Sequence, residues 1–285
     1  MISQSVLPAT DESSYCISGV DVIVRAPRRL QLVLDRMLAH VSRDCVGTQP
    51  PLQIDARCES DVWHIGGTAP SSKKVLCNGS ALPQVAGAVV ASVLAEIAHY
   101  HDLNVWRAAV VEHDGKALVL AGDDWESCIT LAAHLHTRGW RLLSGDYALV
   151  SRDTFSAISF KKSLHANSSC IASFPLWYRA AVEASPWYSS ADLLAFYAID
   201  PTLVGSESPW GERAPIRAFL QVDGHTAEHP SLEIGDDLLL TDGLRRHDLM
   251  RCGIEVAMLV RSDFNETCDF IERWFMTLGT CEEYG

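Results

Sequence analysis

Short groups of apolar residues alternate with turn residues over the first 80 positions of the chain. The groups lie at 20–24, 52–54, 62–65 and 75–76, and Gly, Pro and Asp separate them. This pattern is typical of short strands joined by turns. One helix is predicted among them, at 29–41, because its apolar residues recur three and four positions apart. The pattern therefore predicts a small β-rich N-terminal part with one helix over residues 1–82.

The pattern changes at Pro83, which opens a predicted helix that runs to about His101 and is rich in Ala and Val. Beyond it, a strand, a loop, a helix and a strand follow one another within a short stretch, which is a βαβ unit and implies parallel strands. The sequence therefore predicts an α/β core with a mixed sheet over residues 83–285. The predicted elements after the first helix are strands 106–111, 117–121 and 147–150, helix 127–137, strands 216–222 and 255–260, and helix 264–278.

The apolar strand 117–121 runs into Gly122 and then into a predicted helix, which is where a phosphate-binding P-loop would lie. Against the pattern G-x-x-x-x-G-K-S/T, the sequence GDDWESCIT keeps only Gly122 and, one place late, a hydroxyl at Thr130. Ser127 replaces the second glycine, Cys128 replaces the lysine that reaches the phosphates, and Ile129 replaces the Mg²⁺-binding hydroxyl. The loop is a degenerate phosphate site.

Three carboxylates, on Asp123, Asp124 and Glu126, stand where a nucleotide would bring its own negative charges. Like charges at such distances repel even when they are partly screened. The sequence therefore predicts no bound nucleotide and no other cofactor.

The stretch 105–167, which contains VWRAAVVEHDGKALVLAG and WRLLSGDYALVSRDTFSAISFKKSLHAN, resembles the HPr kinase/phosphorylase-related family. These are bacterial serine-kinase-like proteins often associated with peptide-tailoring or polysaccharide gene clusters. The stretches 214–222 and 253–261 resemble the later strands of the same family. The resemblance implies a P-loop-like core of the type found in the C-terminal part of HPr kinases.

Most catalytic positions of that family do not match. Trp106 stands where the family has a histidine, and Gly145 replaces the first aspartate of an Asp-Asp pair, so Asp146 is the only matched candidate for a catalytic residue. The resemblance thus implies a pseudokinase that acts as a binding or assembly partner in a bacterial biosynthetic pathway, with peptide natural-product tailoring as one such pathway. The alternative is an active phosphotransferase, or another transferase, with a rebuilt site.

Lys161, Lys162 and His165 match the family stretch that follows the βαβ unit, and Trp177 and Trp187 lie in an aromatic segment soon after. Cations and exposed aromatic rings together favour a protein or peptide partner, because such rings are enriched in contact surfaces. The alternatives are a solvated basic turn and aromatic residues that form core under a long loop.

Other candidate residues have structural interpretations that outweigh the functional ones. The acidic residues of the loop, together with Asp146, could gather around a divalent cation, but an acidic loop is preferred and no metal is predicted. Cys128 near a helix N-terminus could be reactive, but neighbouring carboxylates oppose a thiolate. The histidine pairs 99/101 and 134/136 diverge on a helix and are interpreted as structural.

The composition excludes several classes of protein. The net charge of −13 would repel nucleic acid, and no basic stripe offsets it. No apolar run that could cross a membrane and no secretion signal is apparent from the sequence. Nine cysteines without any C-x-x-C spacing fit reduced thiols, so we expect a cytoplasmic protein. The oligomeric state is left open.

Overall fold

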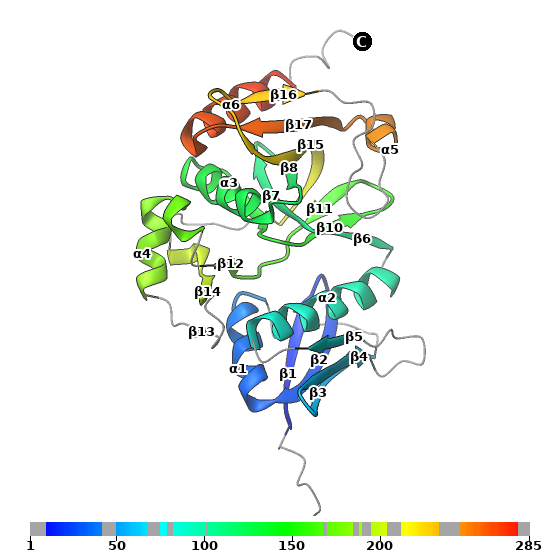
Figure 1. Cartoon of the computed structure of the whole chain (residues 1–285). Coiled ribbons are helices and arrows are strands. Elements are labelled where there is room, and N and C mark those ends of the chain that lie inside the picture. Colours follow the sequence, from blue (N-terminus) through cyan, green and yellow to red (C-terminus); the bar gives the residue numbers. More distant parts are fainter. Residues whose placement is uncertain are drawn as a thin grey trace, which may run out of the picture. The chain divides into compact units, whose positions relative to one another are not determined.

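The structure is a computed structural model, and it forms two compact units (Figure 1). One unit is Met1–His101 with Tyr188–Ala195, and the other is Asp102–Trp187 with Phe196–Gly285. The residues that the structure describes are 10–41, 50–67, 75–78, 82–100, 102–167, 170–184, 188–189, 195–203, 212–233 and 246–278.

The N-terminal unit is a five-stranded sheet in the order β1-β2-β3-β4-β5, on which two helices pack. Strands β2 and β3 are parallel, and the other neighbours are antiparallel. Helix α1 packs on β1 and β2, and α2 packs on β3, β4 and β5, because each helix has an apolar face. The elements are β1 (Thr10–Ile17), β2 (Val20–Pro27), α1 (Arg28–Met37), β3 (Leu52–Glu59), β4 (Val62–Gly67), β5 (Val75–Asn78) and α2 (Leu82–Tyr100).

Helix α2 corrects two expectations drawn from the sequence. It packs on the N-terminal sheet and belongs to that unit, so the units divide after residue 101 and not after residue 82. Its segment Leu82–His99 is also long and apolar enough to cross a membrane, and it is the one such helix in the described part of the chain. Half of that segment is buried in the protein, which accounts for its apolar character.

The second unit is built on a large mixed sheet in the order β6-β10-β11-β15-β8-β7-β9, with β17 paired to β15 and β16 paired to β17. The long strand β15 runs parallel to both β8 and β17, and the remaining pairs are antiparallel. The predicted α/β class with a mixed sheet is therefore confirmed. The strands are β6 (Leu103–Trp106), β7 (Ala108–His113), β8 (Lys116–Ala121), β9 (Arg141–Ser144), β10 (Ala148–Ser151), β11 (Ser156–Ile158), β15 (Arg213–Thr226), β16 (Ser231–Glu233) and β17 (Glu255–Arg261).

Two helices of this unit lie against each other beside the sheet (Figure 1). Helix α3 (Trp125–Thr137) connects β8 to β9 and packs on β7 and β8, and α6 (Phe264–Thr277) packs on α3. A separate antiparallel pair is formed by β12 and β14. The remaining elements of this unit are β12 (Leu164–Asn167), η1 (Ile171–Ser173), α4 (Leu176–Ala184), β14 (Ala195–Ile199), η2 (Pro201–Leu203) and α5 (Arg246–Arg251), whereas β13 (Tyr188–Ser189) is assigned to the N-terminal unit.

One predicted strand is two strands in the structure. The stretch 106–111 breaks at Arg107, so that β6 pairs with β10 while β7 pairs with β8 and β9. An uninterrupted apolar strand would have buried position 107 in the sheet. The break instead leaves Arg107 exposed beside the loop that follows β8.

Candidate functional site

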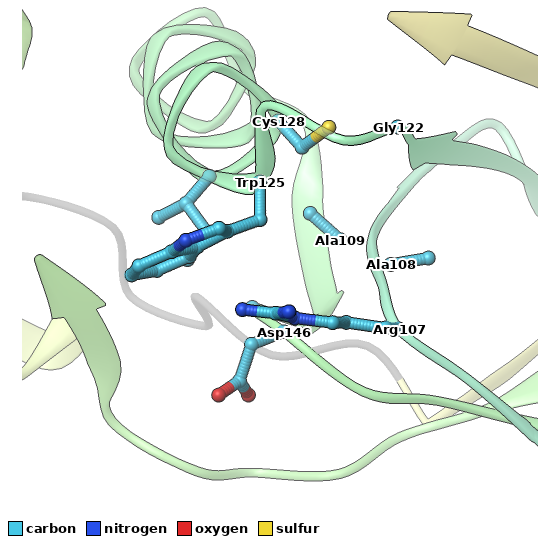
Figure 2. Close-up of a pocket in the computed structure, with 9 residues that line it drawn as sticks. Arg107, Ala108, Ala109, Gly122, Trp125, Cys128 and Asp146 are labelled. Atoms are coloured by element: carbon cyan, nitrogen blue, oxygen red, sulfur yellow. The ribbon is translucent and has the colours of Figure 1, made fainter. Parts of the chain in front are cut away.

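A small pocket lies where β8 ends and α3 begins (Figure 2). Its enclosed space is about 10 Å³, which is room for about one water molecule. Typical small-molecule sites hold about 300–1,000 Å³, so this pocket is far below their usual size. The break between β6 and β7, the loop after β8, the first turns of α3 and the loop after β9 supply its walls. The lining residues are Arg107, Ala108, Ala109, Gly122, Trp125, Cys128, Ile129, Gly145 and Asp146.

Gly122 has a packing role that the sequence did not indicate. A Cβ atom added there would lie 2.3 Å from the main-chain oxygen of Val222 on β15. No side chain is accommodated at such a distance from a backbone atom. Glycine is therefore required for β8 to end against β15, whether or not a phosphate binds nearby.

The N-terminus of α3 is capped by the chain's own carboxylate. Asp124 is the N-cap residue, and its Oδ1 accepts a hydrogen bond from the backbone N–H of Ser127 at 3.2 Å. The Ser127 hydroxyl donates to Oδ2 of the same side chain. A guanidinium nitrogen of Arg261 lies 3.7 Å from that oxygen. The positive end of the helix dipole thus faces a carboxylate of the protein at the position where a P-loop would hold a phosphate.

The three other positions of the degenerate loop are also directed inward. Cys128 is buried, and burial together with the charge of Asp124 raises the pKa of its thiol to about 12. Ile129 is buried, and the hydroxyl of Thr130, also buried, donates to the carbonyl of Glu126 at 2.7 Å. A thiol that is protonated at neutral pH can neither replace a lysine cation nor act as a nucleophile.

Asp146 is not the isolated carboxylate that the sequence indicated. Its Oδ2 accepts a hydrogen bond from the ammonium group of Lys162 at 2.6 Å, and the side chain of Lys162 is only 1% exposed. The other oxygen of Asp146, Oδ1, is buried with no hydrogen-bond partner among the described residues. The site therefore contains a buried ion pair with one unsatisfied acceptor.

Arg107 adds a cation to the same pocket. Its guanidinium carbon lies 5.5 Å from the centroid of the Trp125 ring, which is a cation–π distance (Figure 2). In the described part of the chain, Arg107 forms no salt bridge with Asp146 or with another carboxylate. The pocket therefore presents a positive charge that no described acid pairs with. One signal for it was present in the sequence, namely an arginine inside an otherwise apolar run.

Trp106 and Gly145, the two mismatched positions of the sequence resemblance, both have packing roles. Trp106 is buried, and its ring meets that of Phe219 edge to face with centroids 6.0 Å apart. A Cβ atom at Gly145 would lie 2.3 Å from Cδ2 of Leu164. An aspartate at position 145 would therefore require Leu164 to move.

The acidic residues of the loop do not converge on one point. Asp124 interacts with Arg261, Asp146 pairs with Lys162, and Asp123 is exposed and does not line the pocket. No cluster of three or more potential metal ligands is found among the described residues. The geometry thus offers no support for a divalent cation at these carboxylates.

The two histidines of α3 have separate partners. A ring nitrogen of His134 lies 2.9 Å from the carbonyl of Ser173, and a ring nitrogen of His136 lies 2.6 Å from the hydroxyl of Tyr178. Burial lowers the pKa of His134 and lowers the pKa of His136 to about 4. His134 joins α3 to η1, and His136 joins α3 to α4, as expected of structural histidines.

Both lysines that were predicted to bind a partner have ion-pair partners within the protein. Lys162 is buried in the ion pair with Asp146, and Lys161 reaches Glu212 at 3.0 Å. Burial, and then the charge of Lys162, lower the pKa of His165 well below its usual value. The expected basic stretch is therefore corrected, since its central cation points into the protein.

The aromatic segment divides between core and surface. Phe174 and Tyr178 are buried and pack edge to face, with centroids 5.9 Å apart. Trp177 is 71% exposed, and its neighbour Leu176 is 74% exposed. Trp187 lies outside the described residues. Of the two tryptophans predicted to contact a partner, Trp177 lies in the described part of the chain, and it is exposed.

Of the comparisons with known proteins, the one with solved structures found similarity. No protein-family model matches the chain, and no curated protein matches it. Among solved structures, the chain is similar to the Hpr(Ser) kinase/phosphatase from Coxiella burnetii. The two are 16% identical, the match covers 61% of this chain and 99% of the other, and the TM-score is 0.32.

Proposed function

We propose that this protein is a non-catalytic, HPr-kinase-like binding or assembly partner in a bacterial biosynthetic pathway. The resemblance of residues 105–167 to HPr kinases supports a P-loop-like core, and the mismatches within those motifs support the absence of phosphate transfer. The proposal includes a cytoplasmic location and, as the most specific pathway, peptide natural-product tailoring. The partner in this proposal is a protein or a peptide.

The observation that carries the proposal is the capped N-terminus of α3. Nucleotide phosphates bind a P-loop through backbone N–H groups at a helix N-terminus and through a lysine. Here the carboxylate of Asp124 accepts the N–H of Ser127, and a neutral thiol stands in place of the lysine. A phosphate at this point would have to displace the Asp124 carboxylate from the Ser127 N–H, and no lysine stands at the P-loop position to hold it.

The exposed pair Leu176 and Trp177 is the feature that supports a macromolecular partner. Both side chains lie in the first turn of α4, and both are more than two-thirds exposed. Tryptophan is enriched among residues that dominate binding energies at interfaces. This pair, named here the α4 tip, is the contact site in the proposal.

Calorimetry with ATP and Mg²⁺ tests the catalytic half of the proposal. We expect no heat of binding, and no rise in melting temperature, under conditions in which a P-loop ATPase used as a control gives both. A ligand at 100 times its Kd stabilises a protein by about 2.7 kcal/mol, so ATP binding would raise the melting temperature measurably. A micromolar Kd for ATP would overturn the proposal.

Co-purification with the enzymes and precursor peptides encoded beside the gene tests the binding half. We expect Trp177→Ala to weaken capture of the true partner by tenfold or more, corresponding to about 1.4 kcal/mol or above. Met250→Ala, which truncates another exposed apolar side chain in the same unit, is the matched control. Undiminished binding by a folded Trp177→Ala protein would rule out the α4 tip.

The alternative, a transferase with a rebuilt site, rests on the cations around Asp146. Lys162 contacts Asp146, and Arg107 lines the same pocket. These groups could stabilise developing negative charge. Transfer of labelled phosphate from ATP to a partner, lost in Arg107→Gln, would establish this alternative over the non-catalytic role.

A further inference from the structure

Helix α1 of the N-terminal unit has a basic outer face. The helix packs on β1, β2 and α2 with its buried side, and its exposed residues recur on the opposite side (Figure 1). The exposed residues, named here the α1 face, are Arg28, Arg29, Leu32 and Arg36. We propose that the α1 face binds an acidic helix of a partner protein, whose carboxylates pair with the arginines on either side of Leu32. The proposal goes beyond the proposed function and does not depend on it, because the α4 tip belongs to the other unit.

The stability of α1 does not account for its arginines. Arg28 and Arg29 lie in the first turn, where a cation opposes the helix dipole. The N-cap residue is Pro27, which makes no capping hydrogen bond with its side chain, and the first turn contains no acid. Helices α3 and α6, in contrast, each have an aspartate N-cap and an acid in the first turn. Carboxylates supplied by a partner would remove the unfavourable charge interaction at the start of α1.

The acids near α1 leave its outer face positive. Asp11 lies 3.5 Å from Arg28 in an exposed contact, which contributes little. Asp35, the one acid of α1, accepts a hydrogen bond from the hydroxyl of Tyr15 at 2.7 Å. Arg29 has no ion-pair partner within the described residues. The net charge of −13 does not cancel this local charge, because physiological salt screens charges more than about 8 Å away.

The spacing of the α1 face matches that of a second helix. Arg29 precedes Leu32 by three positions and Arg36 follows it by four, so the two arginines lie about 10 Å apart along the helix axis. Two glutamates seven positions apart on a partner helix have the same separation. Each carboxylate can accept two hydrogen bonds from a guanidinium. Leu32, which is 51% exposed, can pack on an apolar side chain between the two glutamates.

The α1 face suits a protein better than a membrane or a nucleic acid. The apolar side of α1 is buried in its own unit, so Leu32 is the one large apolar residue of this helix that could enter a lipid layer. Binding to a nucleic acid depends on many phosphate contacts, and three arginines on a helix of 10 residues supply few. An acidic helix needs only two carboxylates to use this face.

Fluorescence anisotropy of a labelled helical peptide, titrated with the full chain, tests the inference. The probe is an alanine- and glutamine-based peptide of about 20 residues with two glutamates seven positions apart and a leucine between them. We expect saturable binding that weakens as the salt concentration rises. The control peptide has lysines in place of the glutamates and should bind at least about tenfold more weakly. Equal binding of the two peptides, or no binding of the glutamate peptide at low salt, would overturn the inference.

Charge reversal at two exposed arginines of the same unit locates the binding surface. Arg29→Glu should weaken binding of the glutamate peptide by about tenfold or more. Its melting temperature should be unchanged or raised, because an acid in the first turn complements the helix dipole. Arg57→Glu, the same change at an exposed arginine of β3, is the matched control and should leave the affinity within about twofold. Equal losses in the two variants would mean that net charge, and not the α1 face, governs binding.

Co-sedimentation with vesicles that contain phosphatidylserine examines the competing partner. We expect the full chain to stay in the supernatant at the concentrations that saturate the glutamate peptide. Sedimentation with the vesicles that is lost in Arg29→Glu would assign the α1 face to a membrane and overturn the inference. Neither result bears on the α4 tip, which Trp177→Ala tests separately.

Discussion

Gly122 illustrates how one residue can have two explanations at once. In the sequence it is the surviving first glycine of a phosphate loop, whereas in the structure it allows β8 to approach β15, with no room for a Cβ beside the Val222 oxygen. The sequence could not predict this contact, because β15 follows β8 only after a long intervening stretch. A glycine retained in a degenerate motif is therefore not by itself evidence for a phosphate site.

Replacement of Gly122 by alanine is expected to lower the free energy of unfolding by about 1–3 kcal/mol, because backbone atoms must shift to admit the methyl group. Urea denaturation measures the change. Gly224→Ala is the control, since a Cβ there would lie 3.9 Å from the nearest side-chain atom, which is ordinary contact. If both variants unfold at the same midpoint, the close contact does not limit stability.

Cys128 gives a second prediction at the scale of one residue. Its thiol pKa is raised to about 12 by burial and by Asp124, so it stays protonated and unreactive at pH 8. Iodoacetamide should therefore alkylate the exposed Cys58 and Cys252 in the native protein and label Cys128 only after denaturation. Peptide mass spectrometry distinguishes the sites. Native labelling of Cys128 as fast as Cys252 would show a thiolate there.

At the scale of single elements, the start of α3 was predicted only approximately. The pattern predicts Ser127 as the first helical residue, whereas the helix begins at Trp125 with Asp124 as its N-cap. The acidic residues were interpreted as hostile to phosphate, and their role as a cap was missed. Aspartate is a preferred N-cap residue, so this was a signal that the sequence did contain.

Removal of the cap should destabilise the protein. Asp124→Ala is expected to cost about 1 kcal/mol, because the Ser127 N–H loses its acceptor. Asp124→Asn should cost less, since an amide oxygen can still accept that hydrogen bond. Asp123→Ala, a neighbouring exposed position, is the control and should change stability by less than about 0.5 kcal/mol. Thermal denaturation ranks the three, and equal effects at 123 and 124 would exclude a capping role.

The contact between α3 and the segment leading to α4 predicts a pH dependence. Burial lowers the pKa of His136 from 6.5 to about 4, so between these values the unfolded chain binds a proton that the folded chain does not. Stability therefore falls as the pH falls through this window, by up to about 3 kcal/mol. The pKa values of His134 and His165 are also lowered, so both act in the same direction.

The test is the slope of unfolding free energy against pH, measured by urea denaturation from pH 7 to pH 4.5. His136→Gln should reduce this slope because its side chain does not titrate. The slope is compared between the two proteins, and not the unfolding free energy itself, because the substitution also changes the hydrogen bond to Tyr178 and so shifts stability at every pH. An unchanged slope in the variant would mean that His136 is not responsible.

At the scale of the whole molecule, the sequence predicted the fold class correctly but not the boundary between the two units. The apolar patterns of most strands and of the terminal helix were sufficient to predict an α/β core with a mixed sheet. The boundary after residue 101 was not predicted, because the burial of α2 on β3, β4 and β5 depends on contacts between distant segments. For the same reason the burial of Lys162 was missed, since its partner Asp146 lies on another loop.

The position of β15 also bears on how the chain reaches its native state. During synthesis β8 leaves the ribosome before β15, so one edge of β8 stays unpaired while residues 122–212 are made. Unpaired apolar edges are templates for aggregation, and parallel pairings between distant segments form slowly. A chain that stops at residue 211 should therefore accumulate in inclusion bodies, whereas the full chain is recovered from the supernatant. A monomeric, cooperatively unfolding 1–211 fragment would show that the sheet tolerates the missing strand. If the fragment aggregates as expected, the nascent chain needs a chaperone to cover the β8 edge until β15 is made.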